Sequence, residues 1–572
     1  MYLSPVSDIE TFMAKKSLPK SKSAQAKHAA LANNAPLIAE RWLPWIPVVI
    51  GALVFSTGLT NEMLGIDDHT ATVDNPAVRD FKLFGNFNLG MYAPLTWAAY
   101  GVAYALGKDS PFWYHLFSLA VHAFNIWLVF HLLRRLDLGQ KTALAVAFLF
   151  AIHPIQVESV SWIAGFSTPF FSTFYLLACL KYLDFTEDSE RKASYWLALL
   201  FFLAACLAKS AAVTLPLTFI VFDLWQKRPI FDARRMLSYV PFFLISIGFG
   251  LLTIYSREQS SVVMETPGSD FSPLERLLVL CYTPVLYWYK LLFPFKLNVY
   301  YSFNKVNGQF PWPYFAAPFV LAGVGFAAWK FRQKAPWFWF GLLFFFANIS
   351  VMLPFTSQGT FEFCADHYNY LAMIGIALIL VQGWGMLQKK WSFLTWIGLA
   401  WGLMIAVLCV QQIRIWKDTR TVVTNAIDNG FYQNGLMYAA RGKDFGSKGK
   451  IKEAIADFNK SLEINPSLYE SYKYRGGLYG VTKQYDKSVA DLSKYLEHYP
   501  DDAEQYFNRG LSLLNLGNTQ GAIADFSKTL ELNPDFARAY RARGNAYLNL
   551  GERAKGDADL KEWEKRQGAA GK

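Results

Sequence analysis

Cysteine is scarce in this sequence, with five among 572 residues, and the positions of the cysteines exclude a disulfide framework. Four of them lie inside apolar runs, and only Cys364 lies in an expected loop. Disulfide-stapled secreted domains instead carry regularly spaced cysteines in short, loop-rich chains. We therefore interpret these residues as packing residues.

Charged residues are also few. They make up 17% of the sequence, whereas 53% of the residues are hydrophobic and 17% are aromatic. Soluble globular domains carry about 25% charged residues, so this composition predicts a membrane protein. The first apolar run, 43–59, follows a basic tail of residues 1–41 and lacks an A-x-A-like cleavage site, so we expect it to stay as the first span.

Signatures of several common chemistries are missing. The sequence has no P-loop, no Gly-rich dinucleotide motif and no nucleophile elbow. No cluster of His, Cys, Asp and Glu has the spacing of metal ligands. We therefore predict no metal site, and we expect no nucleic-acid partner.

Apolar runs recur through residues 42–413, which we predict to be one multi-span membrane domain. Basic residues mark every second loop between the runs, and Lys and Arg near span ends are retained in the cytoplasm. The pattern predicts about eleven spans, with the tail 1–41 in the cytoplasm and the C-terminal region outside. The predicted spans are 43–60, 112–133, 142–155, 167–183, 195–208, 211–225, 237–255, 313–329, 336–354, 368–387 and 391–413.

Two long loops fall on the predicted outer face, 61–111 and 256–312. The second contains an apolar run at 274–293 that would break the alternation of basic loops if it crossed the membrane. We expect this run to form an interfacial or re-entrant helix.

Beyond the membrane domain the sequence repeats itself. Residues 414–434 are predicted to form a linker and half repeat, and a 34-residue period follows in 435–572, seen in "YAARG", "YKYRG", "YFNRG" and "YRARG". This period is typical of tetratricopeptide repeats, helix pairs that stack into a solenoid with a concave binding surface. The predicted units are 435–468, 469–502, 503–536 and 537–567. The residues expected to bind a protein or peptide partner are Tyr438, Arg441, Tyr472, Arg475, Tyr506, Arg509, Tyr540 and Arg543. The whole chain is thus predicted to be all-α, a polytopic membrane helix bundle followed by an α-solenoid.

Several polar side chains fall beside apolar runs on the predicted outer face, where an ionisable group is costly and suggests function. Lys209 has no acidic neighbour in the sequence, so it either binds an anion such as a lipid phosphate, or merely caps a helix or reaches the lipid headgroups. His153 alone is more typical of a hydrogen-bonded structural histidine than of a ligand. Other candidates on this face include Glu158, Arg276, Lys290, Asp366 and His367.

The stretch "GIDDHTATVDNPAVRD", residues 65–80, places two adjacent carboxylates, Asp67 and Asp68, just outside the first span. A carboxylate there is suited to take a proton from a hydroxyl nucleophile, which is general-base chemistry. The alternative is a helix N-cap or a solvated acidic loop. The later "DNPAVRD" is typical of a turn followed by a capped helix start.

Six stretches, in this order along the chain, carry a resemblance to a known family. They are "DDHTATVDNPAVRD", "PLTWAAYGVAYALGKDSPFWYHLFSLAVHAFNIWLVFHLLRRL", "HPIQVESVSW", "AKSAAVTLPLTFIVFDLW", "ADHYNYL" and "RIWKD". With them, the chain resembles the bacterial relatives of the transmembrane and tetratricopeptide-repeat-containing O-mannosyltransferases, which are multi-span glycosyltransferases of the GT-C type. The resemblance implies a polyprenyl-phosphate sugar as donor substrate, no other certain cofactor, and transfer to a hydroxyl of a protein or glycan on the outer face of a bacterial inner membrane.

The resemblance also implies roles for particular residues. Asp67 or Asp68 would supply the catalytic base. Lys209 would bind the donor phosphate, with help from His367 or Arg276.

Two departures from the family pattern keep a second interpretation open. After "HPIQVESVSW" such sequences usually carry a charged run, whereas this chain reads "IAGFSTPFFS". Where they usually have Asp-Arg-Tyr, this chain has Asp366, His367 and Tyr368. The alternative is a non-catalytic, membrane-anchored scaffold for an envelope or secretion complex. Convergence of the loop aspartates, Lys209 and Asp366 on one cavity would favour the enzyme.

Overall fold

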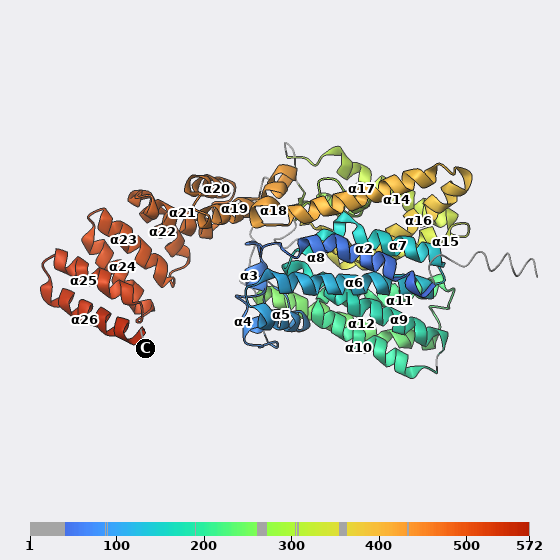
Figure 1. The fold of residues 1–572 in the computed structure, drawn as a ribbon, viewed down its shortest axis with the longest axis horizontal. Helices are drawn as coiled ribbons and strands as arrows, with labels where there is room; N and C mark the ends of the chain where they lie inside the picture. The colour runs from blue at the N-terminus through green and yellow to red at the C-terminus, as the bar shows by residue number, and fades with distance from the viewer. Residues whose placement is uncertain are drawn as a thin grey trace, which may run out of the picture.

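The computed structural model has two parts, a helix bundle and a curved row of helix pairs that ends at the C-terminus (Figure 1). The structure describes residues 40–85, 87–88, 90–188, 190–259, 271–303, 305, 308–353, 363–431 and 434–570. Most of the predicted cytoplasmic tail, residues 1–39, and residues 260–270 of the second outer loop lie outside this description. The all-α prediction is confirmed, because the strands of the described part are two antiparallel two-residue segments, β1 (Tyr301–Ser302) and β2 (Phe363–Cys364).

Each predicted span coincides with a helix. These helices are α2 (Trp45–Phe55), α6 (Pro111–Arg135), α7 (Gln140–Ile152), α9 (Ser167–Glu187), α10 (Lys192–Ala208), α11 (Leu215–Trp225), α12 (Ala233–Gln259), α14 (Trp312–Phe331), α15 (Pro336–Ile349), α16 (Met373–Lys390) and α17 (Leu394–Ile415). Within the described residues, α6, α12, α14 and α17 are each long and apolar enough to cross a membrane, and α7 with the bent continuation Pro154–Ser161 is a fifth candidate. The chain is thus a membrane protein, while the total of about eleven spans stays a prediction.

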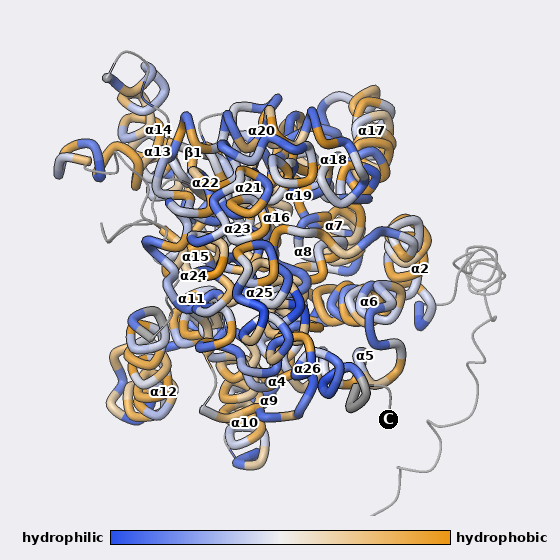
Figure 2. The backbone as a smooth tube through the Cα atoms, turned by 90° about the vertical axis from the view of Figure 1, so that its left-hand side faces the viewer, coloured by the Kyte–Doolittle hydropathy of each residue, from blue (hydrophilic) through white to orange (hydrophobic). Residues whose placement is uncertain are grey.

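The helices differ in how far their apolar side chains are covered. In α12 and α17 only 11% of the apolar window is buried, against 50% in α6. Figure 2 shows hydrophobic residues along both sparsely covered helices, which lie at the periphery of the bundle. Uncovered apolar side chains at these positions are suited to contact with lipid, whereas α6 packs into the core with α7 and α9.

Two glycines allow a close crossing of α15 and α16. Gly341 on α15 faces Gly375 on α16, and a Cβ added to Gly375 would overlap the carbonyl oxygen of Gly341. Small residues commonly let helices approach closely in membranes. The crossing holds α16 in place, and with it the 3-10 turn η7 (Asp366–Asn369) that precedes α16.

Short elements gather at the end of the bundle where the row of helix pairs is attached (Figure 1). The first outer loop contains α3 (Asp68–Ala71) and α4 (Pro76–Arg79), and Asn75 caps α4 as the sequence predicts. It also contains α5 (Pro94–Gly107), an apolar helix that was not predicted from the sequence. The short helix α8 (Val157–Ser161) lies at the same end.

The apolar run predicted to be interfacial is α13 (Pro273–Leu292). It begins with a capping box in which Ser272 and Glu275 exchange hydrogen bonds with each other's backbone. Its position relative to the membrane surface stays a prediction.

The C-terminal part is a solenoid of four helix pairs. Its helices are α19 (Gly435–Ser447), α20 (Ile451–Ile464), α21 (Tyr469–Val481), α22 (Tyr485–His498), α23 (Ala503–Asn515), α24 (Thr519–Leu532), α25 (Ala537–Asn549) and α26 (Arg553–Ala570). The pairs begin at the starting residues of the four predicted units. A glycine on the first helix faces a ring on the second, as Gly510 faces Phe526. α18 (Thr419–Ala426) and a turn at Ile427–Phe431 join α17 to the first pair.

Candidate active site

Asp68 is a structural residue of the first outer loop. It is fully buried, and its two carboxylate oxygens accept hydrogen bonds from the backbone N–H groups of Leu64 at 2.7 Å and Ala164 at 2.9 Å. Burial raises the pKa of Asp68 to about 7, and the two N–H donors oppose that rise. Both carboxylate oxygens are therefore occupied. One bonds the backbone of the loop itself, and the other connects the loop to the segment after α8.

Asp67 is placed differently. It precedes α3, yet its side chain does not cap that helix, which excludes the N-cap interpretation for this residue. Its carboxylate lies close enough to Tyr300 to raise the pKa of the phenol, after the larger effect of burial. Burial raises the pKa of Asp67 to about 6. Asp67 is thus the member of the pair that is suited to proton transfer near neutral pH.

Glu158 and His367 form a tight pair that joins α8 to η7. The Glu158 carboxylate accepts a hydrogen bond from the His367 backbone N–H, and its other oxygen lies 2.8 Å from the ring Nδ1. Burial, and then the charge of Lys209, keep the pKa of His367 well below its usual value. The ring is therefore neutral, and when Nδ1–H donates to Glu158 the other nitrogen carries a lone pair.

Lys209 lies between α10 and the turn η5 (Ser210–Thr214). Its ammonium donates a hydrogen bond of 2.8 Å to the hydroxyl of Thr168. Burial lowers the pKa of Lys209 to about 8, and the nearby Glu158 carboxylate acts in the opposite direction. The ammonium thus points into the protein, which disfavours the alternative that it reaches the lipid headgroups, and it stays mostly charged at neutral pH.

Lys209 and His367 line the same small cavity, together with Thr168, Asn348 and Tyr370 among others. The cavity has a volume of about 20 Å³, which is room for about one water molecule. A sugar phosphate is far larger than this. Binding of such a donor therefore requires the walls of the cavity to move apart.

Asp366 lies beside this group on η7. Its carboxylate accepts hydrogen bonds from the Tyr301 hydroxyl at 2.9 and 3.0 Å. The charge of Glu158 adds to burial in raising the pKa of Asp366, and the charge of Lys290 opposes the rise. Glu158 thus acts electrostatically on both Lys209 and Asp366, and Asp67 is linked to it only through their shared effect on Tyr300. Of these four groups only Lys209 lines the cavity, so they do not converge on it.

Two other predicted site residues have different roles. His153 is buried, with Nε2 3.0 Å from the Leu291 carbonyl oxygen, and Nδ1 accepts from the Ile155 N–H, so it is the structural histidine that the sequence favoured. Arg276 is exposed on α13, where its Nε donates to the Phe271 carbonyl. The prediction that Arg276 helps Lys209 to bind phosphate is not supported, because this exposed guanidinium does not line the cavity.

The repeat arginines are engaged inside the solenoid. Each donates two hydrogen bonds of 2.7–2.9 Å to the aspartate 16 residues later, on the second helix of its own unit. Each guanidinium also lies 5.4–5.9 Å from the ring of the preceding repeat tyrosine. The four units are Tyr438–Arg441–Asp457, Tyr472–Arg475–Asp491, Tyr506–Arg509–Asp525 and Tyr540–Arg543–Asp559. These side chains brace the helix pairs, which differs from the partner-binding role predicted for them.

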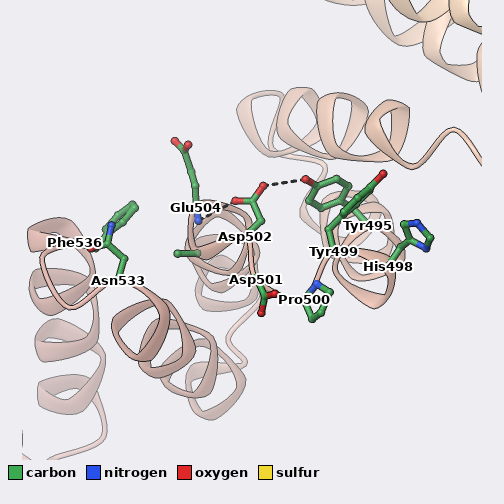
Figure 3. Close-up of a pocket in the computed structure, with 10 residues that line it drawn as sticks. Tyr495, His498, Tyr499, Pro500, Asp501, Asp502, Glu504, Asn533 and Phe536 are labelled. Atoms are coloured by element: carbon green, nitrogen blue, oxygen red, sulfur yellow. Dashed lines mark hydrogen bonds between the residues drawn. The ribbon is translucent and has the colours of Figure 1, made fainter. Parts of the chain in front are cut away.

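The solenoid has a groove elsewhere. It has a volume of about 700 Å³ and lies at the turns between α22 and α23 and between α24 and α25 (Figure 3). Tyr499, Asp501 and Glu504 are exposed there, whereas the Asp502 carboxylate is engaged by the Tyr495 hydroxyl at 3.0 Å. The groove therefore offers aromatic faces and carboxylates to a partner.

Sequence reasoning missed Tyr300, Tyr301 and Thr168. Tyrosine is common in this chain, with 30 residues, and the two tyrosines stand in a loop without a motif. Thr168 lies within the stretch "IAGFSTPFFS", which departs from the pattern that the resemblance leads one to expect. No signal in the sequence marks these residues, because their importance comes only from contacts with distant segments.

Comparison with known proteins places these observations in a family context. A family model described as tetratricopeptide repeat matches residues 503–536, and a second of the same description matches residues 437–468. Protein O-mannosyl-transferase Tmtc1 of Drosophila melanogaster is 34% identical over 125 residues, which are 22% of this chain and 14% of that protein. Protein O-mannosyl-transferase F38B6.6 of Caenorhabditis elegans is 20% identical over 474 residues, which cover 78% of this chain and 65% of that protein.

The matched regions span less than two thirds of the length of these relatives. A solved structure of MamA residues from Desulfovibrio magneticus RS-1 is 15% identical, with a TM-score of 0.26, and covers 26% of this chain and 85% of that chain. The relatives, together with the repeats, show that the chain is a homologue of the proteins named protein O-mannosyl-transferases and carries tetratricopeptide repeats in its C-terminal part.

Proposed function

We propose that the chain is a membrane glycosyltransferase that moves a sugar from a polyprenyl-phosphate donor to a hydroxyl of a protein or glycan. The observation that carries this proposal is the electrostatic linkage of three buried groups: Glu158 acts on Lys209, and Glu158 and Asp67 both act on Tyr300. These residues come from three separate segments, and burying their charges is costly unless the arrangement has a use.

The reaction follows from the chemistry of these groups. The acceptor oxygen attacks the anomeric carbon of the donor sugar, and Asp67 takes the proton of the acceptor hydroxyl. The bond between the anomeric carbon and the phosphate oxygen breaks, and polyprenyl phosphate leaves with its new negative charge facing the Lys209 ammonium. Glu158 orients His367, whose neutral ring lines the donor cavity but contributes no positive charge to the phosphate.

The alternation of basic loops supports a location of this end of the bundle outside the cytoplasm, in a bacterial inner membrane. The repeats leave the bundle at the same end as α3 and α4 (Figure 1), so they would share a compartment with the acceptor. We propose that they recruit the acceptor or a protein partner. The exposed carboxylates and rings of the groove suit a peptide with basic side chains.

The small cavity favours a second candidate function. A pocket of about 20 Å³ holds no sugar in this conformation, which is what a membrane-anchored scaffold with a residual site would show. Mass spectrometry of envelope proteins and glycans from cells with and without the gene separates the two. Hexose-modified peptides or glycans that disappear without the gene support the transferase. If the modified peptides and glycans are the same with and without the gene, but an envelope complex is lost without it, the scaffold is supported.

A further inference from the structure

The loop that carries Asp67 is held by the segment that begins the solenoid. The Gly65 backbone N–H donates a hydrogen bond of 2.8 Å to the hydroxyl of Thr419, a residue 354 positions away and only 6% exposed. The Glu62 N–H donates to the Lys417 carbonyl at 2.8 Å. The loop before the base is thus hydrogen-bonded at Glu62 and Gly65 to the residues that lead into α18.

The same helix also packs against Tyr300, which lies within electrostatic reach of the base. Val423 and Ala426 of α18 and Met437 of α19 form an apolar cluster against which Ile66 and Tyr300 pack. Ile66 immediately precedes Asp67, and Tyr300 lies within electrostatic reach of its carboxylate. One helix therefore contacts the residues on both sides of the proposed proton-transfer group.

Two amides fasten the loop that carries Tyr300 to the same helix. The Asn298 side chain donates to the Ala426 carbonyl at 3.2 Å, and the Asn425 side chain donates to the Leu297 carbonyl at 3.0 Å. Backbone carbonyls at the C-terminal end of a helix lack helical partners, so the bond from Asn298 also satisfies the carbonyl of Ala426, the last residue of α18. The contact between α18 and the two outer loops therefore combines specific hydrogen bonds with apolar packing.

We infer that Thr419 is a positioning residue for transfer, and that α18, the start of the repeat region, is part of the catalytic site. This inference rests on the proposed function, because it assigns Asp67 the role of base. The hydroxyl of Thr419 fixes the backbone two residues before Asp67. Small displacements of a reacting group lower rates strongly, by roughly 100-fold for about 1 Å. The helix that leads into the repeats therefore contacts the site directly, and is not only connected to it through the chain.

The test compares Thr419→Val, Thr419→Ser and the control Thr395→Val in the full chain in nanodiscs. Valine keeps the shape of threonine but leaves the Gly65 N–H without its acceptor, and serine keeps the hydroxyl. Thr395 is exposed near the start of α17, the opposite end of the helix that leads to Thr419. The readouts are hydrogen exchange of peptides covering residues 62–68, and kcat and KM for a polyprenyl-phosphate sugar.

We expect Thr419→Val to speed exchange at 62–68 and to lower kcat by roughly 10- to 100-fold. The KM for the donor should change by less than about twofold, because the Lys209 ammonium that is proposed to bind the phosphate is unchanged. Thr419→Ser and Thr395→Val should resemble the unmutated chain. Unchanged exchange and kcat in Thr419→Val would overturn the inference while leaving the proposed function intact. If Thr419→Val speeds exchange but the unmutated chain transfers no sugar, the proposed function and the role of Thr419 in transfer are both overturned. The contact between the loop and Thr419 would still stand.

Discussion

Glu158 and His367 are 209 residues apart in the sequence and are joined through both carboxylate oxygens of Glu158, at 2.8 Å each. One oxygen binds the backbone of His367 and the other its ring, so the position of η7 and the orientation of the imidazole are fixed together. The resemblance noted from the sequence leads one to expect arginine at the position of His367. In this chain the phosphate charge would be met by Lys209, since burial keeps His367 neutral.

Asp68→Asn should destabilise the protein. The amide keeps one acceptor oxygen but turns an NH2 group toward the second backbone N–H, and an unsatisfied buried donor costs about 1–3 kcal/mol. The raised pKa of Asp68 gives the effect a pH dependence. The stability that the protonated carboxyl contributes is present below its ordinary pKa and is lost as the pH rises through about 7.

The measurement is thermal unfolding in detergent at pH 5 and pH 8. We expect a lower midpoint for Asp68→Asn than for the unmutated chain at pH 5, and a smaller difference at pH 8. Asp67→Asn serves as the matched control because its side chain does not cap α3. Equal midpoints for all three proteins at pH 5 would show that the loop does not depend on Asp68.

The rate of transfer should follow a bell-shaped pH profile. Asp67 must be deprotonated to act as the base, so activity should fall as the pH drops through about 6. Lys209 must stay protonated, so activity should fall as the pH rises through about 8. Lys209→Arg should shift the alkaline limb upward because guanidinium stays charged. A profile without an alkaline limb in the unmutated chain would contradict the role of Lys209.

Lys209→Met should weaken binding of the donor. Methionine keeps much of the apolar stem and removes the ammonium, so donor affinity should fall by roughly 10-fold or more, as expected when a charge-assisted hydrogen bond worth about 1.5–3 kcal/mol is lost. Binding of a polyprenyl-phosphate sugar to protein in nanodiscs checks this. Lys181→Met is the control, because Lys181 is partly exposed and pairs with Asp184 on α9. Equal affinities for both variants would remove Lys209 from the phosphate site.

Arg509→Met should loosen the solenoid locally. It leaves the Asp525 carboxylate, 5% exposed, without the two hydrogen bonds that it accepts, at a cost of about 1–3 kcal/mol. Hydrogen exchange should quicken in α23 and α24. Lys528→Met removes the exposed pair with Glu531 and should leave exchange unchanged. Slow exchange in both variants would mean that the Arg–Asp pairs do not brace the repeats.

The sequence predicted the regular parts of this protein well. A 34-residue period predicted the starts of the four helix pairs, and every apolar run became a helix, because periodicity and apolar length are local properties. The arginine pairs were open to detection too, since an aspartate follows each "YxxRG" arginine at a constant step of 16 residues. This constant step indicates an internal pairing of the arginines in preference to a contact with a partner.

The candidate site was harder to predict because it is assembled from distant segments. Asp67 and Asp68 are indistinguishable by sequence, and only the N–H groups of Leu64 and Ala164 separate the structural residue from the proposed base. The size of the cavity and the placement of Arg276 depend on how the helices pack. No periodic pattern reports such packing.

The central claim is that Asp67 removes a proton from the acceptor. The direct measurement is the rate of sugar transfer from polyprenyl-phosphate mannose and polyprenyl-phosphate glucose to envelope protein by the purified chain in nanodiscs, compared between the unmutated protein and Asp67→Asn. We predict transfer by the unmutated chain and a rate roughly 10²–10⁴-fold lower for Asp67→Asn, with an unchanged melting midpoint. Transfer by Asp67→Asn at the unmutated rate would contradict the assignment of the base, and no transfer by the unmutated chain from either donor would favour the scaffold.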